Sequence, residues 1–406
     1  MVVNLQINLR AHFGDFMVRQ SDRVESRRKS SPSKRATLED VARLAGVGPM
    51  TVSRTINKHP YVSEATARKV RAAIRKLNYR PNHAARMLTG QLSRSIGLIV
   101  PDIADTFFSV VIHAVQETAR ERGYLVWLAA SDGDPTLEAA QVEMMTHQPV
   151  DGILLVPVDA RNKYLKQLAT GLLPIVTMDR PIEVATTDSV GVENKAGAMM
   201  AVEHLVQHGY KRITCLVANS HLLTMKQRIA GYRESMQRAK LPRDKEIPLS
   251  SQASAKAALS ELFSSRNRPE ALFTANNAST IWVLEALKEM KIEMGKDIAL
   301  VGFDDVDFYT LTTPPITTIR QPAAELGDIS ARLLLQRIKG EFRGPCLRTV
   351  LPVTLILRES CGCRRDPMYE SATRSTGDPQ RFSAGRHSSP HADGLGPMTK
   401  CNLDPA

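Results

Sequence analysis

The stretch Thr37–Asn57, TLEDVARLAGVGPMTVSRTIN, predicts two short helices joined by a tight turn. Apolar residues recur at the i, i+3, i+4, i+7 spacing of one helix face, namely Leu38, Val41, Ala42 and Ala45. Thr37 stands where a helix N-cap is expected, and Asp40 follows three residues later, as in a capping box. Gly46 then ends this first helix, because glycine adopts the left-handed conformation of a helix C-terminus at little cost.

A second helix is expected to start at Pro49, because proline suits the first helical position and Gly48 is a tolerable N-cap. This helix buries Val52 and Ile56 and exposes Met50, Thr51, Ser53, Arg54 and Asn57. Short polar side chains and one arginine on an exposed helix face favour a helix that enters the major groove of DNA. The alternative is an ordinary helical hairpin with Arg54 as a solvated surface charge.

The run T-L-x-D-V-A-x-x-A-G-V-x-x-x-T-V-S-R-x-x-N resembles the headpiece of the lactose-repressor/galactose-repressor (LacI/GalR) family of bacterial transcription regulators. The resemblance continues as YVSEATARKVRAAIRKLNYRPNHAARML and extends to about Ser360. It departs from the family at Gly48, where relatives usually carry serine.

The resemblance implies a helix-turn-helix headpiece over residues 36–80 and a hinge helix with its linker over 81–94. In the family, the hinge helix pairs with its copy in the dimer and enters the minor groove, where Leu88 would be the apolar wedge that separates a base step. An ordinary interdomain linker is the alternative for this segment. The DNA-binding residues that follow are Thr37, Pro49, Met50, Thr51, Ser53, Arg54, Asn57, Asn82, Arg86 and Leu88.

The positive charge of the chain is concentrated at its N-terminal end. The whole sequence has 54 Lys and Arg against 42 Asp and Glu, and residues 1–94 hold 19 of these basic residues but only 6 acidic ones. A basic head on a nearly neutral body predicts a module that binds a polyanion. A third helix after Ser63 turns Val70, Ile74 and Leu77 inward. Its basic residues are candidates for phosphate contacts, which position a protein on DNA without reading sequence.

From Ser95 onward, short β-rich runs alternate with helical stretches, which predicts parallel sheets covered by helices on both faces. The expected strands are Ile96–Val100, Leu125–Ala130, Gly152–Val156, Pro174–Met178, Arg212–Val217, Ala271–Thr274 and Ile298–Gly302. The resemblance implies an α/β periplasmic-binding-protein-like core over 95–360, with two doubly wound lobes joined by three strands. We assign 95–190 and the 323–340 helix to one lobe, and 191–318 and the final strands near 347–357 to the other.

Ligands of doubly wound sheets bind beyond the carboxyl ends of the strands. Asp102, Asp179, Asn276 and Asp304 each follow a predicted strand. Carboxylates and amides suit the hydroxyls of a sugar, and an aromatic ring suits its apolar face. Matched to the family, the effector-binding residues are Phe107, Asp179, Arg228, Asn276 and Asp304. Capping or structural ion pairing is the alternative role for each residue taken singly.

Two positions near this set qualify the resemblance. Asn277 stands where the family usually has aspartate, so details of the pocket are expected to differ. Leu222 stands where purine-binding relatives carry arginine, which argues against a purine effector.

The sequence contains none of the common motifs of an enzyme active site. There is no G-x-S-x-G, Walker A or H-E-x-x-H motif, and no cofactor or catalytic residue is predicted. Asp304, Asp305 and Asp307 are close in sequence, but adjacent carboxylates at a strand end more often bind a ligand or stabilise the fold, so no metal is predicted.

Residues 1–35 and 361–406 lie outside the resemblance and are expected to be disordered, since they are polar, charged and without hydrophobic period. Met17 is a candidate for the true start of the chain. The five cysteines form no disulfide framework and fit a reducing cytoplasm, as does the absence of a signal peptide or a long apolar run.

These features predict a sequence-specific DNA-binding transcription regulator, expected to be a repressor, that binds a near-palindromic operator as a homodimer. A small molecule, expected to be a sugar or sugar derivative, would control its operator affinity from the cleft between the lobes. A solute-binding transport component with the same cleft is the alternative from another class, and it predicts a signal peptide and no basic headpiece. A sugar-modifying enzyme is a third alternative.

Overall fold

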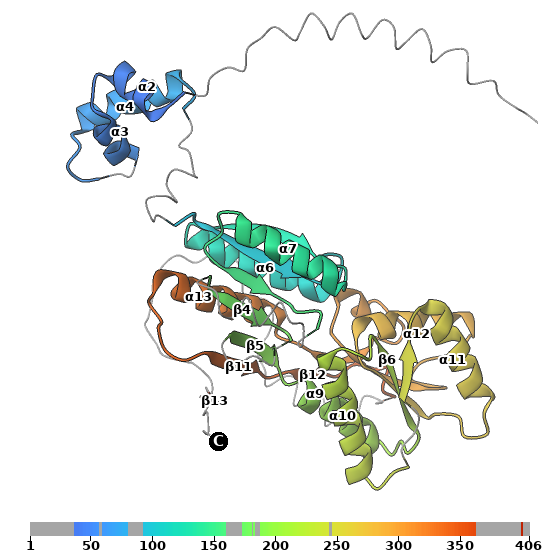
Figure 1. Cartoon of the computed structure of the whole chain (residues 1–406). Coiled ribbons are helices and arrows are strands. Elements are labelled where there is room, and N and C mark those ends of the chain that lie inside the picture. The colour runs from blue at the N-terminus through green and yellow to red at the C-terminus, as the bar shows by residue number, and fades with distance from the viewer. Residues whose placement is uncertain are drawn as a thin grey trace, which may run out of the picture. The chain divides into compact units, whose positions relative to one another are not determined.

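The computed structural model describes residues 36–56, 59–79, 92–159, 173–180, 182, 187–242, 246–362 and 399–400. The chain divides into two compact units, Met1–Leu88 and Thr89–Ala406. The first unit is helical and the second is an α/β structure (Figure 1). In the described part of the chain, none of the helices has the length and apolar character needed to cross a membrane.

The helical unit contains the predicted helix-turn-helix. Its helices are α2 (Leu38–Ala45), α3 (Pro49–Ile56) and α4 (Glu64–Lys76). Thr37 and Asp40 form the expected capping box at the start of α2: Thr37 Oγ1 accepts a hydrogen bond from Asp40 N, and Asp40 Oδ2 accepts one from Thr37 N. Gly46 ends α2 with a φ of 66°, and Ser63 caps α4. The predicted helix boundaries in this unit are therefore confirmed.

One residue from each helix is completely buried in this unit, namely Val41, Val52 and Val70. Val47, in the turn, packs against this small core together with the partly buried Ile56. The turn between α2 and α3 is therefore held by side-chain packing, and both helices are too short to be stable alone in water.

The first lobe of the α/β unit is built on a seven-stranded sheet in the order β13-β11-β5-β4-β3-β1-β2. Its strands pair in parallel except at β13, which is antiparallel to β11. Helices α6 (Thr106–Glu121) and α13 (Ala323–Lys339) cover one face, and α7 (Pro135–His147) packs on the other. The strands are β1 (Ser95–Val100), β2 (Leu125–Ala130), β3 (Ile153–Leu155), β4 (Ile175–Met178), β5 (Asp188–Val192), β11 (Leu347–Leu351) and β13 (Thr399–Lys400).

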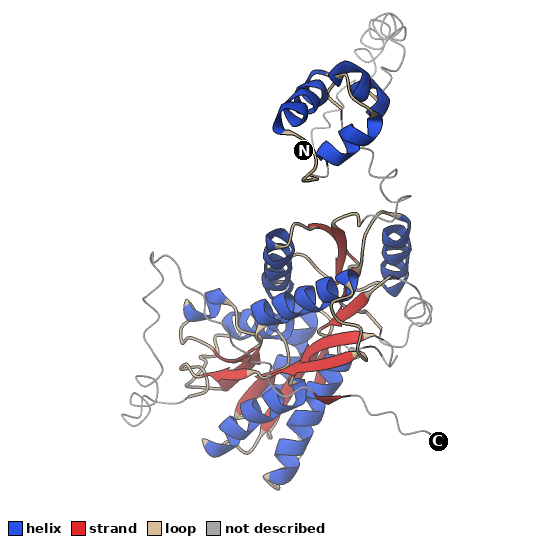
Figure 2. Cartoon of the chain, turned by 90° about the vertical axis from the view of Figure 1, so that its left-hand side faces the viewer, coloured by secondary structure: helices blue, strands red, loops and turns tan. Residues whose placement is uncertain are grey.

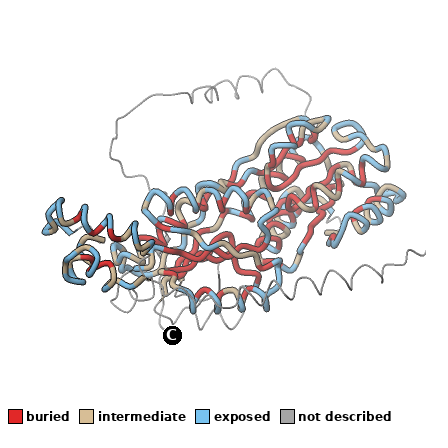
Figure 3. The backbone as a smooth tube through the Cα atoms, turned by 90° about the horizontal axis from the view of Figure 1, so that it is seen from above, coloured by how far each residue is buried: buried red, intermediate tan, exposed pale blue. Residues whose placement is uncertain are grey.

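The second lobe has a six-stranded sheet in the order β12-β10-β9-β8-β6-β7. Helices α9 (Asn194–Gln207) and α10 (Leu223–Arg238) cover one face, and α11 (Gln252–Ser264) and α12 (Asn277–Glu289) cover the other. The strands are β6 (Ile213–Ala218), β7 (Glu246–Leu249), β8 (Ala271–Thr274), β9 (Ala299–Phe303), β10 (Thr317–Arg320) and β12 (Thr354–Ile356), and a 3₁₀ helix, η1, spans Asp307–Thr310. Figure 2 shows the strands of both lobes enclosed by helices, and Figure 3 shows the buried residues gathered in the interior of the α/β unit.

The chain passes between the lobes three times, from β5 to α9, from β10 to α13 and from β11 to β12. This agrees with the predicted two-lobed, doubly wound architecture. The assignment of the final strands needs a correction, because β11 pairs with β5 in the first sheet and only β12 joins the second. The predicted strands are confirmed to within one or two residues at each end, but the strands β5, β7, β10 and β13 were not predicted. The last of these, β13, lies within residues 361–406, which were expected to be disordered.

Two glycines allow helices on the same sheet face to pack closely. A Cβ atom on Gly231 of α10 would lie 2.3 Å from Lys195 O of α9, and one on Gly327 of α13 would lie 2.6 Å from Val111 O of α6. Gly231 lies one helical turn after Arg228 in the QRIAGY motif. The close contact between α9 and α10 therefore fixes the part of α10 that carries Arg228.

Candidate functional site

The carboxyl ends of both sheets face a shared cavity of about 490 Å³ between the lobes. Side chains that follow strands of the first lobe include Asp102, Asp132 and Asp179, and those that follow strands of the second include Asn276 and Asp304. All five residues predicted for effector binding line this cavity: Phe107, Asp179, Arg228, Asn276 and Asp304. The structure therefore brings together residues from across almost two hundred positions of sequence.

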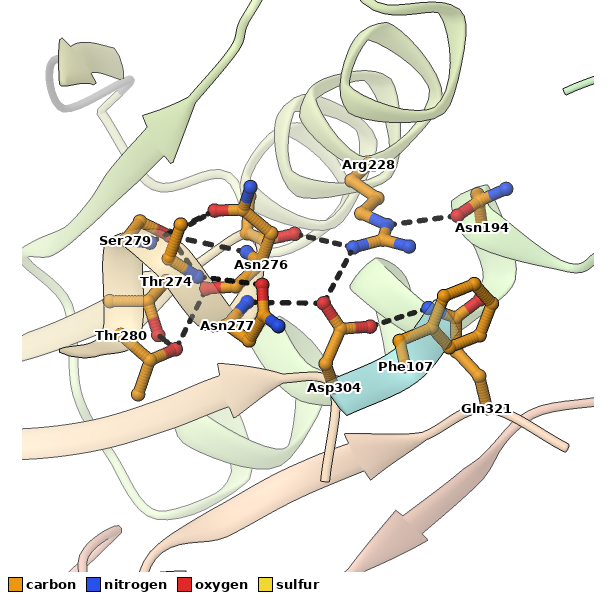
Figure 4. A network of polar contacts seen from close by, with 12 residues as sticks. Phe107, Asn194, Arg228, Thr274, Asn276, Asn277, Ser279, Thr280, Asp304 and Gln321 are labelled. Atoms are coloured by element: carbon orange, nitrogen blue, oxygen red, sulfur yellow. Dashed lines mark hydrogen bonds and ion pairs between the residues drawn. The ribbon is translucent and has the colours of Figure 1, made fainter. Parts of the chain in front are cut away.

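Arg228 is 2% exposed and is held on several sides (Figure 4). Its Nε donates to Asn194 Oδ1 at 2.8 Å, and its Nη1 donates to Ala275 O at 2.8 Å. The guanidinium lies over the Phe303 ring, 3.6 Å from the centroid, in a cation–π contact. Burial lowers the pKa of Arg228, and the nearby carboxylate of Asp304 opposes that change. The result is a fixed, buried cation at the wall of the cavity.

Asp304 lies opposite Arg228, with its Oδ2 3.6 Å from Arg228 Nη1. The same oxygen accepts a hydrogen bond from Asn277 N at 3.0 Å, and Oδ1 accepts one from Gln321 Nε2. Its backbone has a φ of 76°, which non-glycine residues seldom adopt and which recurs at ligand sites. Asp304 is thus positioned by the strand end, by α12 and by the second connection between the lobes.

Asn276 caps a helix, which is the structural role that the sequence analysis gave as its alternative. It is the N-cap of α12, and its Oδ1 accepts hydrogen bonds from Ser279 N at 3.1 Å and Ser279 Oγ at 2.7 Å. Its side chain also lines the cavity, so capping fixes the orientation in which the amide faces a ligand. The structural and the ligand-binding roles are therefore compatible for this residue.

The first lobe contributes Asp179 and Phe107. Asp179 follows β4 with a φ of 61°, and its Oδ2 lies 3.4 Å from Arg180 Nε. Burial raises the pKa of Asp179, and the guanidinium groups of Arg180 and Arg228 oppose this effect. Phe107 packs edge-on against Phe108, with ring centroids 5.1 Å apart, and supplies an apolar surface. Carboxylates beside an aromatic surface are the combination that a sugar ring requires.

Sequence reasoning missed several residues of the cavity. Asp105, Arg180 and Gln321 line it, and none of them was predicted as a site residue. Gln321 follows β10 directly, so recognition of that short strand would have identified it. Asp105 precedes the predicted helix of Phe108 as an N-cap, and this signal was available in the sequence. Asn277 and Leu222, noted as departures from the family, also line the cavity.

The predicted DNA-binding residues of α3 are largely accessible in the helical unit. Met50 is 65% exposed, and Pro49 and Arg54 are also exposed, whereas Thr51 and Ser53 are half-buried. Thr37 is exposed, and its hydroxyl belongs to the capping box. Four further predicted residues lie outside the described residues: Asn57, Asn82, Arg86 and Leu88.

A metal site and a catalytic site were not predicted. Within the described residues, no group of three or more His, Cys, Asp or Glu side chains could hold a metal ion. Asp305 and Asp307 do not join Asp304 in a cluster, because Asp305 pairs with Arg320 and Arg358 and Asp307 is exposed.

Two parts of the chain match models of known protein families. Residues 37–82 match the model of bacterial regulatory proteins of the lacI family, and residues 202–361 match a periplasmic binding protein-like domain. The ribose operon repressor of Escherichia coli K12 is 34% identical over 309 residues, which cover 75% of this chain and 93% of that protein. The repressor PurR of Photobacterium profundum is 32% identical over 308 residues, which cover 75% of this chain and 92% of that protein.

Among solved structures, the lac repressor dimer bound to operator and the anti-inducer ONPF matches with a TM-score of 0.72 and 28% identity. That match covers 81% of this chain and all of the other. A complex of the regulator CelR with cellobiose matches with a TM-score of 0.60 and 31% identity, over 80% of this chain and all of the other. The chain therefore belongs to the lacI family of bacterial regulatory proteins and is a DNA-binding transcriptional regulator with a ligand-binding core.

Proposed function

We propose that this protein is a repressor whose operator affinity is controlled by a neutral monosaccharide bound between the lobes. The observation that carries the proposal is the convergence of Asp179, Arg228, Asn276 and Asp304 with Phe107 around one interlobe cavity. The ribose operon repressor supports a monosaccharide by its name, and the complex of CelR with the disaccharide cellobiose supports a neutral sugar more generally.

The charges of the cavity favour a neutral sugar over a sugar phosphate. Its wall contains five carboxylates, those of Asp102, Asp105, Asp132, Asp179 and Asp304. Two arginines face them, Arg180 and Arg228, and both already lie beside carboxylates. A phosphate would meet a net negative wall, whereas hydroxyl groups can donate to these carboxylates and accept from Arg228.

The headpiece would read the operator through α3. Arg54 is suited to a bidentate contact with guanine, and the exposed Met50 is suited to apolar contact with a thymine methyl group. The basic residues of α4 would hold phosphates and fix the register. As a homodimer, the protein would place one α3 in each half of a near-palindromic operator. We assign Asn57, Asn82, Arg86 and Leu88 to the same interface, on the resemblance alone.

Control would act through the three connections between the lobes. Two residues of these connections contact the ligand-facing set: Asn194 accepts from Arg228, and Gln321 donates to Asp304. A sugar that rearranges these contacts would change the angle between the lobes. By linkage, a sugar that weakens operator binding must bind less tightly to the operator complex, and a co-repressor must do the reverse.

The proposed place of action is the cytoplasm, at the chromosome, and the proposed role is regulation without catalysis. The relatives identified by sequence are repressors, and repressors act by binding rather than by chemistry.

The test begins with selection of a binding sequence from random duplexes by the full-length protein. Calorimetry then measures the affinity of the free protein for ribose, for other neutral sugars, for ribose 5-phosphate and for free purine bases. Fluorescence anisotropy measures operator affinity with each. We expect one neutral sugar to bind and to change operator affinity at least about fivefold, the lower range of allosteric coupling. Binding of a sugar phosphate or a free purine base in its place would overturn the assignment of the effector.

A further inference from the structure

A hydrogen bond joins the two lobes directly across the cavity. Asn277 Nδ2, on the second lobe, donates to Asp105 Oδ1, on the first lobe, at 2.9 Å. Neither residue belongs to the segments that connect the lobes, since Asp105 lies between β1 and α6 and Asn277 is the first residue of α12. The bond therefore depends on the distance between the lobes and breaks when they separate.

Each partner is held rigidly by its own lobe. Asp105 is the N-cap of α6, and the same Oδ1 accepts from Phe107 N at 2.8 Å. Asn277 Oδ1 accepts from Ala278 N at 2.7 Å, and Asn277 N donates to Asp304 Oδ2 at 3.0 Å. Because the amide oxygen is occupied within the second lobe, the amide nitrogen must face Asp105, which fixes the direction of the bond.

The chemistry at position 277 suits this contact. Asp105 already lies near the carboxylate of Asp304, and burial together with this neighbour raises the pKa of Asp105. A neutral donor at position 277 satisfies the Asp105 carboxylate across the cavity, and Asn277 is itself only 9% exposed. A carboxylate at position 277 would instead bring a third negative group to this place and would repel Asp105.

We propose that Asp105 and Asn277 form a latch that stabilises the closed arrangement of the lobes before any effector binds. The latch would act as a positioning pair, because it sets how much of the free protein has its effector-binding residues assembled. An effector that binds the closed form gains affinity in proportion to that fraction. The gain in effector affinity rests on the proposed function, whereas closure of the lobes is a property of the free protein.

Exchange of the two residues gives a test with an internal rescue. Asn277→Asp opposes two carboxylates and should open the lobes. In the double variant Asp105→Asn with Asn277→Asp, the new amide at position 105 keeps its oxygen on Phe107 N and turns its nitrogen toward the new carboxylate at position 277. A donor and an acceptor then face each other in the reverse direction, and the lobes should close again. Both new side chains retain an oxygen for their helix N-termini, since Asn and Asp are equally good in that role. Circular dichroism and thermal melting verify that each variant is folded.

The readout is the distance between the lobes, measured by pulsed electron paramagnetic resonance. Spin-labelled non-natural amino acids replace Glu143 on α7 and Ala257 on α11, both exposed, and an excess of unlabelled protein leaves one labelled copy in each dimer. Without effector, we expect a short distance in the parent, a longer one in Asn277→Asp and the short one again in the double variant. An unchanged distance in Asn277→Asp, or failure of the double variant to recover, overturns the latch.

Ribose affinity provides the second measurement. We expect Asn277→Asp to weaken ribose binding about tenfold, in proportion to the lost closed fraction, and the double variant to recover most of it. If the parent binds no sugar, the proposed function fails, and the distances still decide whether the latch exists.

Discussion

Arg228 and Asp304 face each other across 3.6 Å in the wall of the cavity, and each is held in place by other partners. Arg228 is fixed by Asn194, Ala275 and the ring of Phe303. Asp304 is fixed by Asn277 N and Gln321. The two charges are therefore positioned before a ligand arrives, which lowers the entropy cost of binding.

Replacement of either charge should disable the response to the effector. We expect Asp304→Asn and Arg228→Ala each to weaken effector binding about tenfold to a hundredfold, because hydrogen bonds to charged groups are lost. Operator binding should remain specific for its sequence, because the headpiece is unchanged, but its affinity should no longer respond to the effector. Calorimetry with the effector and anisotropy with the operator measure the two effects. Glu143→Ala, an exposed change on α7, is the matched control. Unchanged effector affinity in both variants would refute the site.

Three of the five residues predicted for effector binding, Asp179, Asn276 and Asp304, were predictable because they follow strands, and the ends of parallel strands meet at one edge of a sheet. Phe107 and Arg228 lie on helices, and their assignment came from the match to the family. The latch between Asp105 and Asn277 was not predictable, because a hydrogen bond between lobes depends on their angle rather than on any local pattern.

Most of the fold followed from hydrophobic runs, and the errors have a common cause. The strands β5, β7 and β10 contain Asp, Ser, Glu, Pro or Thr and lack a continuous apolar run. The position of β11 in the first sheet could not be read from its sequence, because register with β5 is a long-range pairing. Local patterns carry least information for short strands that lack a continuous apolar run.

Arg54 should contribute to recognition of sequence rather than to general attraction to DNA. We expect Arg54→Ala to weaken operator binding by about 1–3 kcal/mol, the value of one good bidentate base contact, and to change binding to random duplex much less. Arg75→Ala, on α4, is the control, because loss of a phosphate contact weakens both kinds of binding alike. Anisotropy titrations at one salt concentration measure the six affinities of the parent and the two variants for both duplexes. Equal losses on both duplexes for Arg54→Ala would contradict a base-reading role.

His204 should make the stability of the second lobe depend on pH. Burial, with a smaller effect from His208, lowers the pKa of His204 to about 4 from 6.5. As pH falls, His204 is protonated in the unfolded chain before it is protonated in the folded chain. The contribution of His204 to the free energy of unfolding is therefore complete above pH 6.5 and is lost as pH falls toward 4. We expect a loss of up to about 3 kcal/mol over this range, at 1.36 kcal/mol for each pKa unit.

Urea unfolding of the parent and of His204→Gln between pH 7.5 and pH 4.5 measures this effect. The variant should lose the steep part of the pH dependence. His208→Gln should keep most of it, because burial is the larger cause of the lowered pKa of His204. Parallel curves for the parent and His204→Gln would show that another group is responsible.

Asp305 should stabilise the region where the second lobe meets its connection to α13. Its Oδ2 accepts from Arg320 Nη2 at 2.6 Å, and its Oδ1 accepts from Arg358 Nη1 at 2.7 Å. Burial alone would raise the pKa of Asp305, but hydrogen bonds from Arg358, Arg320 and Thr318 outweigh it and hold the pKa below 3.8. We expect Asp305→Asn to cost about 3 kcal/mol at pH 7, since it leaves the partly buried guanidinium of Arg358 without its carboxylate.

The sign of the pH dependence distinguishes this explanation from a packing defect. Because the folded pKa of Asp305 is lowered, its stabilisation is complete above pH 3.8 and is lost as pH falls through the folded value. The gap in unfolding free energy between the parent and Asp305→Asn should therefore narrow in acid, as measured by urea unfolding at pH 7, 4.5 and 3. Asp307→Asn, an exposed change two residues away, should change stability by less than about 0.5 kcal/mol at every pH. The ion pairs of Asp305 stabilise the parent only while its carboxyl group is ionised. A difference in unfolding free energy that stays constant down to pH 3 would therefore mean that the amide of Asp305→Asn disturbs packing.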